Sequence, residues 1–78
     1  DGTFYGNNKT KKMYFSSLDT ITYDVDATIA EQTACNYIFA GCEELTEIHF
    51  ASVNQAAIEA TSGYSSHWGS NATVYFDL

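Results

Sequence analysis

Basic residues are scarce in this 78-residue chain, which has three lysines, no arginine and a net charge of −7. The lysines all lie within residues 9–12, and from Met13 to Leu78 there are nine acidic side chains and no lysine. Such a surface repels phosphate, so it argues against partnership with nucleic acid or an anionic membrane. The acidity alone indicates no particular partner, because charge of one sign also keeps a small domain soluble.

Cysteines and long apolar runs are also few. Two cysteines cannot make a disulfide-rich scaffold. On one helix, Cys35 and Cys42 would stand about 10 Å apart, too far for a disulfide. A chain reversal at Gly41 would allow a bridge, and two buried thiols are the alternative. No segment approaches the ~20 apolar residues of a membrane-spanning helix. With 45% hydrophobic residues, the composition predicts a single globular domain.

Residues 28–50 predict a helix, a turn and a strand. Apolar residues recur at steps of three and four from Ile29 to Phe39, and Thr28 with Glu31 forms a capping-box pattern. Gly41 can adopt the left-handed conformation that ends a helix. After the turn, Ile48 and Phe50 are apolar residues two positions apart, which places both on one face of a strand. A short helix followed by a short strand is typical of one coil of a solenoid.

A partial repeat supports that interpretation. The segment 18–23 copies the L-x-x-I-x-aromatic pattern of 45–50, and Phe4–Asn7 resembles Phe39–Cys42. About eight inserted residues interrupt the first copy. A third strand is expected at residues 73–76. We therefore predict an α/β solenoid of two to three coils, in which Ile21 and Ile48 are neighbours in adjacent parallel strands.

The two ends of the chain predict different structures. Residues 1–17 fit either a β-hairpin around Gly6-Asn7-Asn8 or the tail of a preceding repeat. Residues 52–78 predict a terminal cap that follows the repeats of 18–51. This cap has a helix starting at Ser52, a stop at Gly63, an anchoring Trp68 and a final edge strand. The helix is expected to pack through four small apolar residues: Val53, Ala56, Ala57 and Ala60.

The string Phe39-x-Gly41-Cys42-x-x-Leu45-x-x-Ile48-x-Phe50 and its partial copy at residues 18–23 resemble the leucine-rich repeats of BspA-type bacterial surface antigens. The downstream segments 54–60 and 71–76 look like the terminal part of such arrays. The chain departs from the pattern in its interrupted first repeat and in its lack of proline. The resemblance implies an extracellular or cell-surface binding or scaffold module, with no catalytic residues.

Several patterns invite a chemical interpretation and fall short of it. Residues 24–28 read D-x-D-x-T, as in haloacid-dehalogenase-like phosphatases, but no lysine follows residue 12. The same acids lack the glycine and terminal glutamate of an EF-hand. Cys35, Cys42 and His49 recur every seven residues, whereas zinc ligands pair at spacings of two to four. We therefore expect no enzyme activity, no metal and no cofactor.

The leading hypothesis is a non-catalytic binding module that contacts a protein partner or a host surface through its sheet. Polar and aromatic residues on a rigid sheet suit recognition. The expected contact residues are exposed ones: Thr20, Thr22, Glu47, His49, Thr73 and Tyr75. The alternative is a purely structural domain that caps a longer array or forms a homodimer through an uncovered coil.

Overall fold

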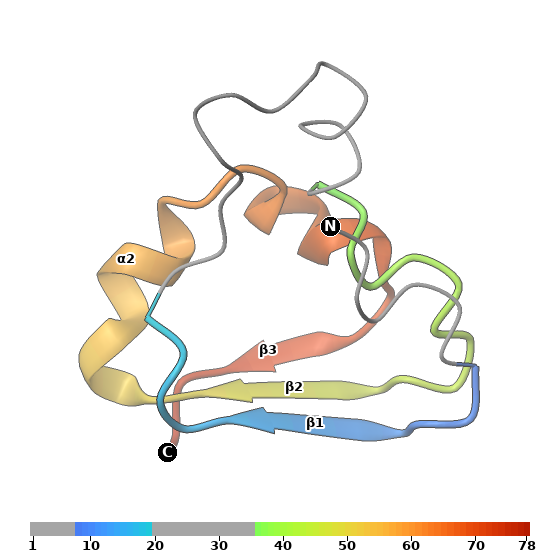
Figure 1. The fold of residues 1–78 in the computed structure, drawn as a ribbon, viewed down its shortest axis with the longest axis horizontal. Coiled ribbons are helices and arrows are strands. Elements are labelled where there is room, and N and C mark those ends of the chain that lie inside the picture. Colours follow the sequence, from blue (N-terminus) through green and yellow to red (C-terminus); the bar gives the residue numbers. More distant parts are fainter. Residues whose placement is uncertain (1–7, 20–35) are drawn as a thin grey trace.

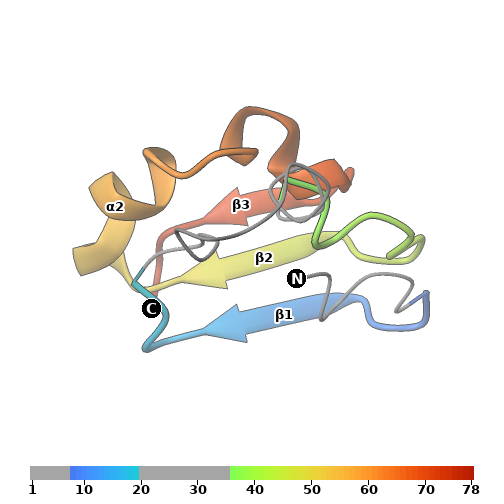
Figure 2. The same cartoon turned by 45° about the horizontal axis from the view of Figure 1, so that its top comes forward.

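A parallel β-sheet organises the molecule. The computed structural model describes residues 8–19 and 36–78, and within them three strands pair in the order β1-β2-β3 (Figures 1 and 2). The strands are β1 (Lys12–Phe15), β2 (Glu47–Phe50) and β3 (Thr73–Tyr75). Met13, Ile48 and Val74 lie level with one another across the sheet. The small α/β fold with short parallel strands is therefore confirmed.

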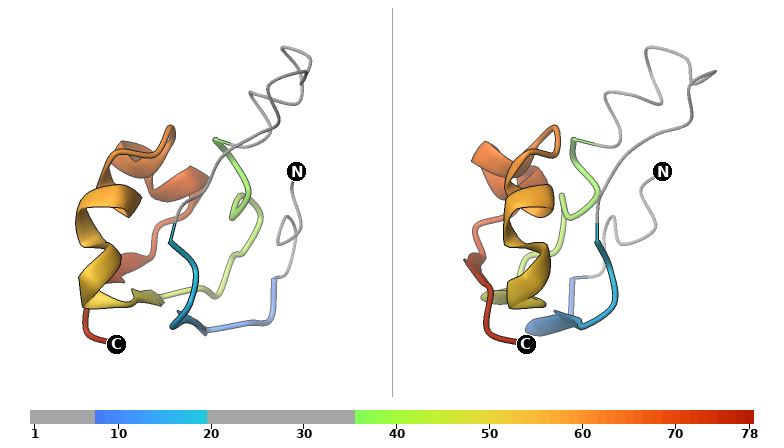
Figure 3. Two further views of the ribbon diagram at one scale, coloured as in Figure 1. Left: turned by 60° about the vertical axis from the view of Figure 1, so that its left-hand side comes forward. Right: turned by 90° about the vertical axis from the view of Figure 1, so that its left-hand side faces the viewer.

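The described parts of the connecting segments lie on one side of this sheet (Figure 3). They include the short 3-10 helices η1 (Ser52–Asn54) and η2 (Tyr64–Gly69) and the helix α2 (Gln55–Glu59). The segment 36–45 lies on that side as well (Figure 1). The opposite face of the sheet, which we call the outer face, is covered by none of these described segments.

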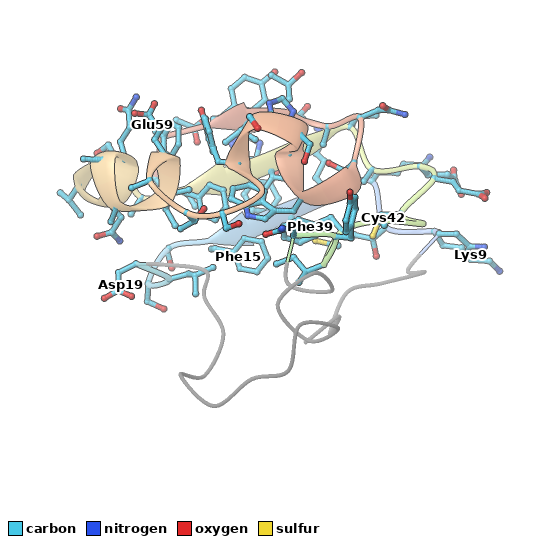
Figure 4. All side chains as sticks on the ribbon, turned by 90° about the horizontal axis from the view of Figure 1, so that it is seen from above. Lys9, Phe15, Asp19, Phe39, Cys42 and Glu59 are labelled. Atoms are coloured by element: carbon cyan, nitrogen blue, oxygen red, sulfur yellow. The ribbon has the colours of Figure 1, made fainter. Side chains whose placement is uncertain are left out.

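The core fills the space between the sheet and these segments. Every second residue of a strand points to the same face of the sheet. Ile48 and Phe50 therefore both point into the core, where they are fully buried. Trp68 is also fully buried, and its ring meets those of Phe39 and Phe50 edge to face at 5.8 and 5.7 Å. Phe15 extends the cluster and lies 6.1 Å from Phe39 between ring centroids (Figure 4). A compact aromatic core thus holds the short strands together.

The predicted pairing of the first two strands is wrong. β2 pairs with residues 12–15, so the neighbour of Ile48 is Met13. Leu18, the predicted start of the first strand, follows β1 without secondary structure and packs half-buried against the core. Ile21 lies outside the described residues. Met13 is therefore the residue of the first strand that is buried beside Ile48.

Of the β-hairpin that is one alternative for residues 1–17, only the second arm lies among the described residues. That arm is β1, and it pairs in parallel with β2 across 35 residues of chain, as Met13 and Ile48 show. Its expected partner arm, Phe4 and Tyr5, lies outside the described residues.

Two helix predictions also need correction. The described end of the first predicted helix, residues 36–40, forms turns, closed by bonds such as Ala40 N–H to the Tyr37 carbonyl at 2.9 Å. Gly41 is left-handed as predicted, with φ of 78°. In the second helix the small-residue stripe is exposed: Val53 is 89% exposed, and Ile58 is the buried contact instead. Neither η1 nor α2 has a side-chain cap hydrogen bond, so the Ser52 capping box is not formed.

The other features of the terminal segment agree with the sequence only in part. Trp68 is the buried anchor and β3 is the final strand, but α2 ends at Glu59, and Gly63, with φ of 89°, precedes η2 instead of ending the helix. The ladder continues past β3, because the Leu78 amide donates to Phe50 O and the Leu78 carbonyl accepts from Ser52 N–H, both at 3.1 Å. The final residues are thereby fixed to the strand β2.

Candidate functional site

A row of three stacked rings crosses the outer face. Tyr14, His49 and Tyr75 occupy equivalent positions on β1, β2 and β3, with side chains on the face opposite to Ile48. The ring centroids of Tyr14 and His49 are 4.6 Å apart, those of His49 and Tyr75 are 4.8 Å apart, and each pair is 12° from parallel. These spacings match the distance between neighbouring strands, so the parallel register itself produces the stack. We call these three residues the aromatic row.

Two carboxylates bind the edges of the central ring. His49 Nδ1 lies 2.8 Å from Asp77 Oδ1, and His49 Nε2 lies 2.6 Å from Glu47 Oε1. Carboxylate oxygens only accept hydrogen bonds, so both contacts are hydrogen bonds when both ring nitrogens carry a proton, that is, when His49 is an imidazolium. Lys12 Nζ stands 3.5 Å from the other oxygen of Glu47. Opposite charges therefore alternate along the face from Lys12 to Asp77.

His49 is on the outer face but is not exposed, so this part of the prediction is wrong. Its exposure is 8%, against 58% for Tyr14 and 39% for Tyr75. The two tyrosine rings cover its faces, and Glu47 and Asp77 cover its edges. The two tyrosine rings therefore form the exposed surface, and His49, which lies between them, holds them in position.

The contacts of His49 change the acidity of the groups involved. The hydrogen bond to Asp77, followed by that to Glu47, raises the pKa of His49 above its usual value, although burial opposes the shift. The hydrogen bond between His49 and Glu47 also lowers the pKa of Glu47, and the positive charge of Lys12 acts in the same direction. Both shifts favour the charged pair.

A maximum of stability in mildly acidic solution is expected from these shifts. The contribution of His49 is complete below its unfolded pKa of 6.5 and is lost as pH rises through the raised folded value. The contribution of Glu47 is complete above its unfolded pKa of 4.5 and is lost as pH falls through the lowered folded value. Urea unfolding midpoints should therefore be highest between these limits and fall as the pH rises above 6.5. In His49→Gln the alkaline fall should vanish; an equal fall in both proteins would contradict this assignment.

Four of the six predicted contact residues come together on the outer face. They are Glu47, His49, Thr73 and Tyr75, with Glu47 and Thr73 in adjacent register positions. Thr20 and Thr22 lie outside the described residues. The sequence analysis missed Lys12, Tyr14 and Asp77. Polar–apolar alternation in 12–15 and the two-residue step from Tyr75 to Asp77 are the signals that could have identified them.

The other chemical patterns gain no support. Residues 24–28 and Cys35 lie outside the described residues. Cys42 is buried in the core, whereas His49 is on the outer face, so these two do not converge. His67 Nδ1 donates to the Ala72 carbonyl at 2.7 Å. Within residues 8–19 and 36–78, no group of three histidine, cysteine or acidic side chains could hold a metal ion.

Comparison with protein-family models, with curated proteins and with solved structures gives no match for this chain. A search of the described part of the chain finds no helix that is both long and apolar enough to cross a membrane. The outer face therefore has to be interpreted from its own geometry.

Proposed function

We propose that this chain is a non-catalytic binding module that contacts a protein partner or a host surface through the outer face. The observation that carries the proposal is the aromatic row, which holds two exposed tyrosines on a hydrogen-bonded sheet. Tyrosine supplies large contact area at low entropic cost, and it is enriched at interfaces. The stack removes still more freedom from both rings before any partner binds.

We further propose that the chain is a short leucine-rich-repeat solenoid of a bacterial cell-surface or secreted protein, as the BspA-like pattern implies. Phe39, Cys42, Leu45, Ile48 and Phe50, the apolar positions of that pattern, are all buried. Asn54 Nδ2 also donates to the Leu18 carbonyl at 3.2 Å, linking the segments that follow β2 and β1. Parallel strands that present one open face suit the extended binding surfaces of such proteins.

Site-specific photo-crosslinking tests the proposal. Tyr75 is replaced by the photoreactive residue benzoylphenylalanine, and the protein is exposed to extracts of host-cell surfaces and of bacterial culture medium. We expect a discrete crosslinked protein that disappears when Tyr14→Ala is added, because Tyr14 belongs to the same surface.

Tyr37 provides the matched control. It is 49% exposed and lies in the 36–45 segment on the other side of the sheet. The same photoreactive residue at position 37 should not give this product. Equal crosslinking from positions 37 and 75 would contradict a specific role for the outer face.

The exposed apolar residues Val53 and Leu78 favour a second candidate, a structural cap or self-association domain. Their exposures are 89% and 43%, and burying them against another copy would be favourable. On this alternative, position 75 gives no partner crosslink and gel filtration gives a mass above the 8.6 kDa of one chain.

A further inference from the structure

The hydrogen bonds of His49 can all be made in only one protonation state. Each ring nitrogen faces a carboxylate oxygen, at 2.8 Å for Asp77 and 2.6 Å for Glu47. A neutral imidazole has one N–H and one lone pair, so it can donate to only one of these acceptors. Loss of the proton therefore leaves one carboxylate facing a lone pair, and that carboxylate is free to take another cation.

Asp77 is the carboxylate that an incoming cation can reach more easily. Its side chain is 53% exposed, whereas that of Glu47 is 27% exposed and also has Lys12 as a partner. Oδ1 of Asp77 accepts from His49, and Oδ2 has no partner among the described residues. Asp77 also stands two residues after Tyr75, so both side chains lie on the same face.

We propose that the outer face binds an arginine side chain of its protein partner at Tyr75 and Asp77, in exchange for the proton on His49 Nδ1. A guanidinium can stack on the exposed ring of Tyr75 while it donates to the carboxylate of Asp77. This inference rests on the proposed function, and it adds the chemistry of the partner.

The charges around the site favour this exchange. The groups that face His49 are Tyr14 from β1, Glu47 from β2, and Tyr75 and Asp77 from β3 and the residues after it. With Lys12 and the imidazolium, the two carboxylates are neutralised; when the proton leaves, the group carries one negative charge. An incoming guanidinium restores neutrality at the site, in a chain whose net charge is −7.

Arginine binding and proton binding are linked, so the exchange can be measured as a pH dependence of arginine affinity. If arginine binding displaces the proton, raising the pH must strengthen arginine binding. The probe is a capped Gly-Arg-Gly-Arg-Gly peptide, titrated into the wild-type chain by calorimetry and NMR from pH 6 to 9. We expect the affinity to rise by up to about tenfold per pH unit below the pKa of His49 and then to level off. Calorimetry in buffers of different ionisation enthalpy should show proton release, and the Tyr75 ring signals should shift.

A pair of variants separates this site from general charge attraction. Asp77→Asn and Glu59→Gln each remove one negative charge, but Glu59 is an exposed residue of α2 on the other side of the sheet. We expect at least fivefold weaker binding for Asp77→Asn and less than twofold for Glu59→Gln. Equal losses in the two variants, or no proton release from the wild type, would overturn the proposal. The wild-type titration does not depend on the variants being folded.

Failure of this inference can be told apart from failure of the proposed function. If position 75 crosslinks a partner but the arginine peptide does not bind, the surface is a binding site and the arginine chemistry is wrong. A neutral oligosaccharide bound in place of the peptide, with no proton release, would also refute it. If neither experiment gives binding at Tyr75, both proposals fail.

Discussion

Replacement of Trp68 by alanine should lower the free energy of unfolding by about 3–5 kcal/mol. The ring is fully buried and meets Phe39, Phe50 and Tyr64 edge to face, with centroids 5.7–5.8 Å apart. Its removal leaves a cavity that three aromatic neighbours cannot fill, because each is held by the sheet or by other ring contacts. In a domain of this size such a loss is a large part of the total stability. Urea unfolding followed by far-ultraviolet circular dichroism measures it.

A second substitution at the same position sharpens the test. The indole nitrogen of Trp68 is buried and has no hydrogen-bond partner within residues 8–19 and 36–78. Trp68→Phe removes that donor and keeps most of the ring, so its cost should stay below about 1.5 kcal/mol. Val53→Ala, at an exposed position, should change stability by less than about 0.5 kcal/mol. A Trp68→Ala variant as stable as Val53→Ala would show that the core is not built around this ring.

Gly63→Ala is the second substitution with a large expected effect, about 3 kcal/mol or more. Gly63 has φ of 89°, a conformation that side chains other than glycine rarely adopt. An added Cβ would also come within 2.9 Å of the Cα atom of Asn36 and 3.0 Å of Trp68 Cδ1. The first contact is with backbone, so it cannot be relieved by a side-chain rotation. The loss is read from thermal and urea unfolding.

Gly69→Ala is the matched control for this prediction. Gly69 has a similar φ of 85°, but its added Cβ would meet the side chains of Tyr37 and Ala40. The half-exposed ring of Tyr37 can move away, so the cost should be close to the conformational strain alone, about 1–2 kcal/mol. If the two substitutions lower the free energy of unfolding equally, the contact with Asn36 does not constrain residue 63.

The sequence predicts those parts of the fold that depend on local patterns. β2 and β3 follow from the spacing of their apolar residues, and the left-handed conformation of Gly41 follows from a glycine placed where the chain turns. The pairing partner of β2 could not be predicted in this way. Both 12–15 and 18–23 carry apolar residues that suit a strand, and the choice between them depends on which segment can bring its apolar residues onto Phe39 and Phe50, a tertiary contact. Phe15 makes that contact, with its ring centroid 6.1 Å from that of Phe39 and 5.6 Å from that of Phe50, and Met13 belongs to the same core cluster.

The same limit applies to the candidate site. Glu47, Thr73 and Tyr75 could be placed on one face because strand parity assigns them there. The burial of His49 could not be foreseen, since two of the four side chains that cover it, Tyr14 and Asp77, are 35 and 28 residues away in the chain. The charge state of the imidazole depends on these same distant neighbours.

The sheet also has a consequence for how the chain folds. Its two pairings join Met13 to Ile48 and Ile48 to Val74, which are 35 and 26 residues apart. None of these three strands can therefore find its neighbour in the described sheet through a short hairpin, and each pairing must first close a long loop at an entropic cost. Such high contact order places this domain among slow-folding small proteins, in the range of milliseconds to seconds. During that time the apolar segments around Phe39 and Phe50 are open to contact with other chains.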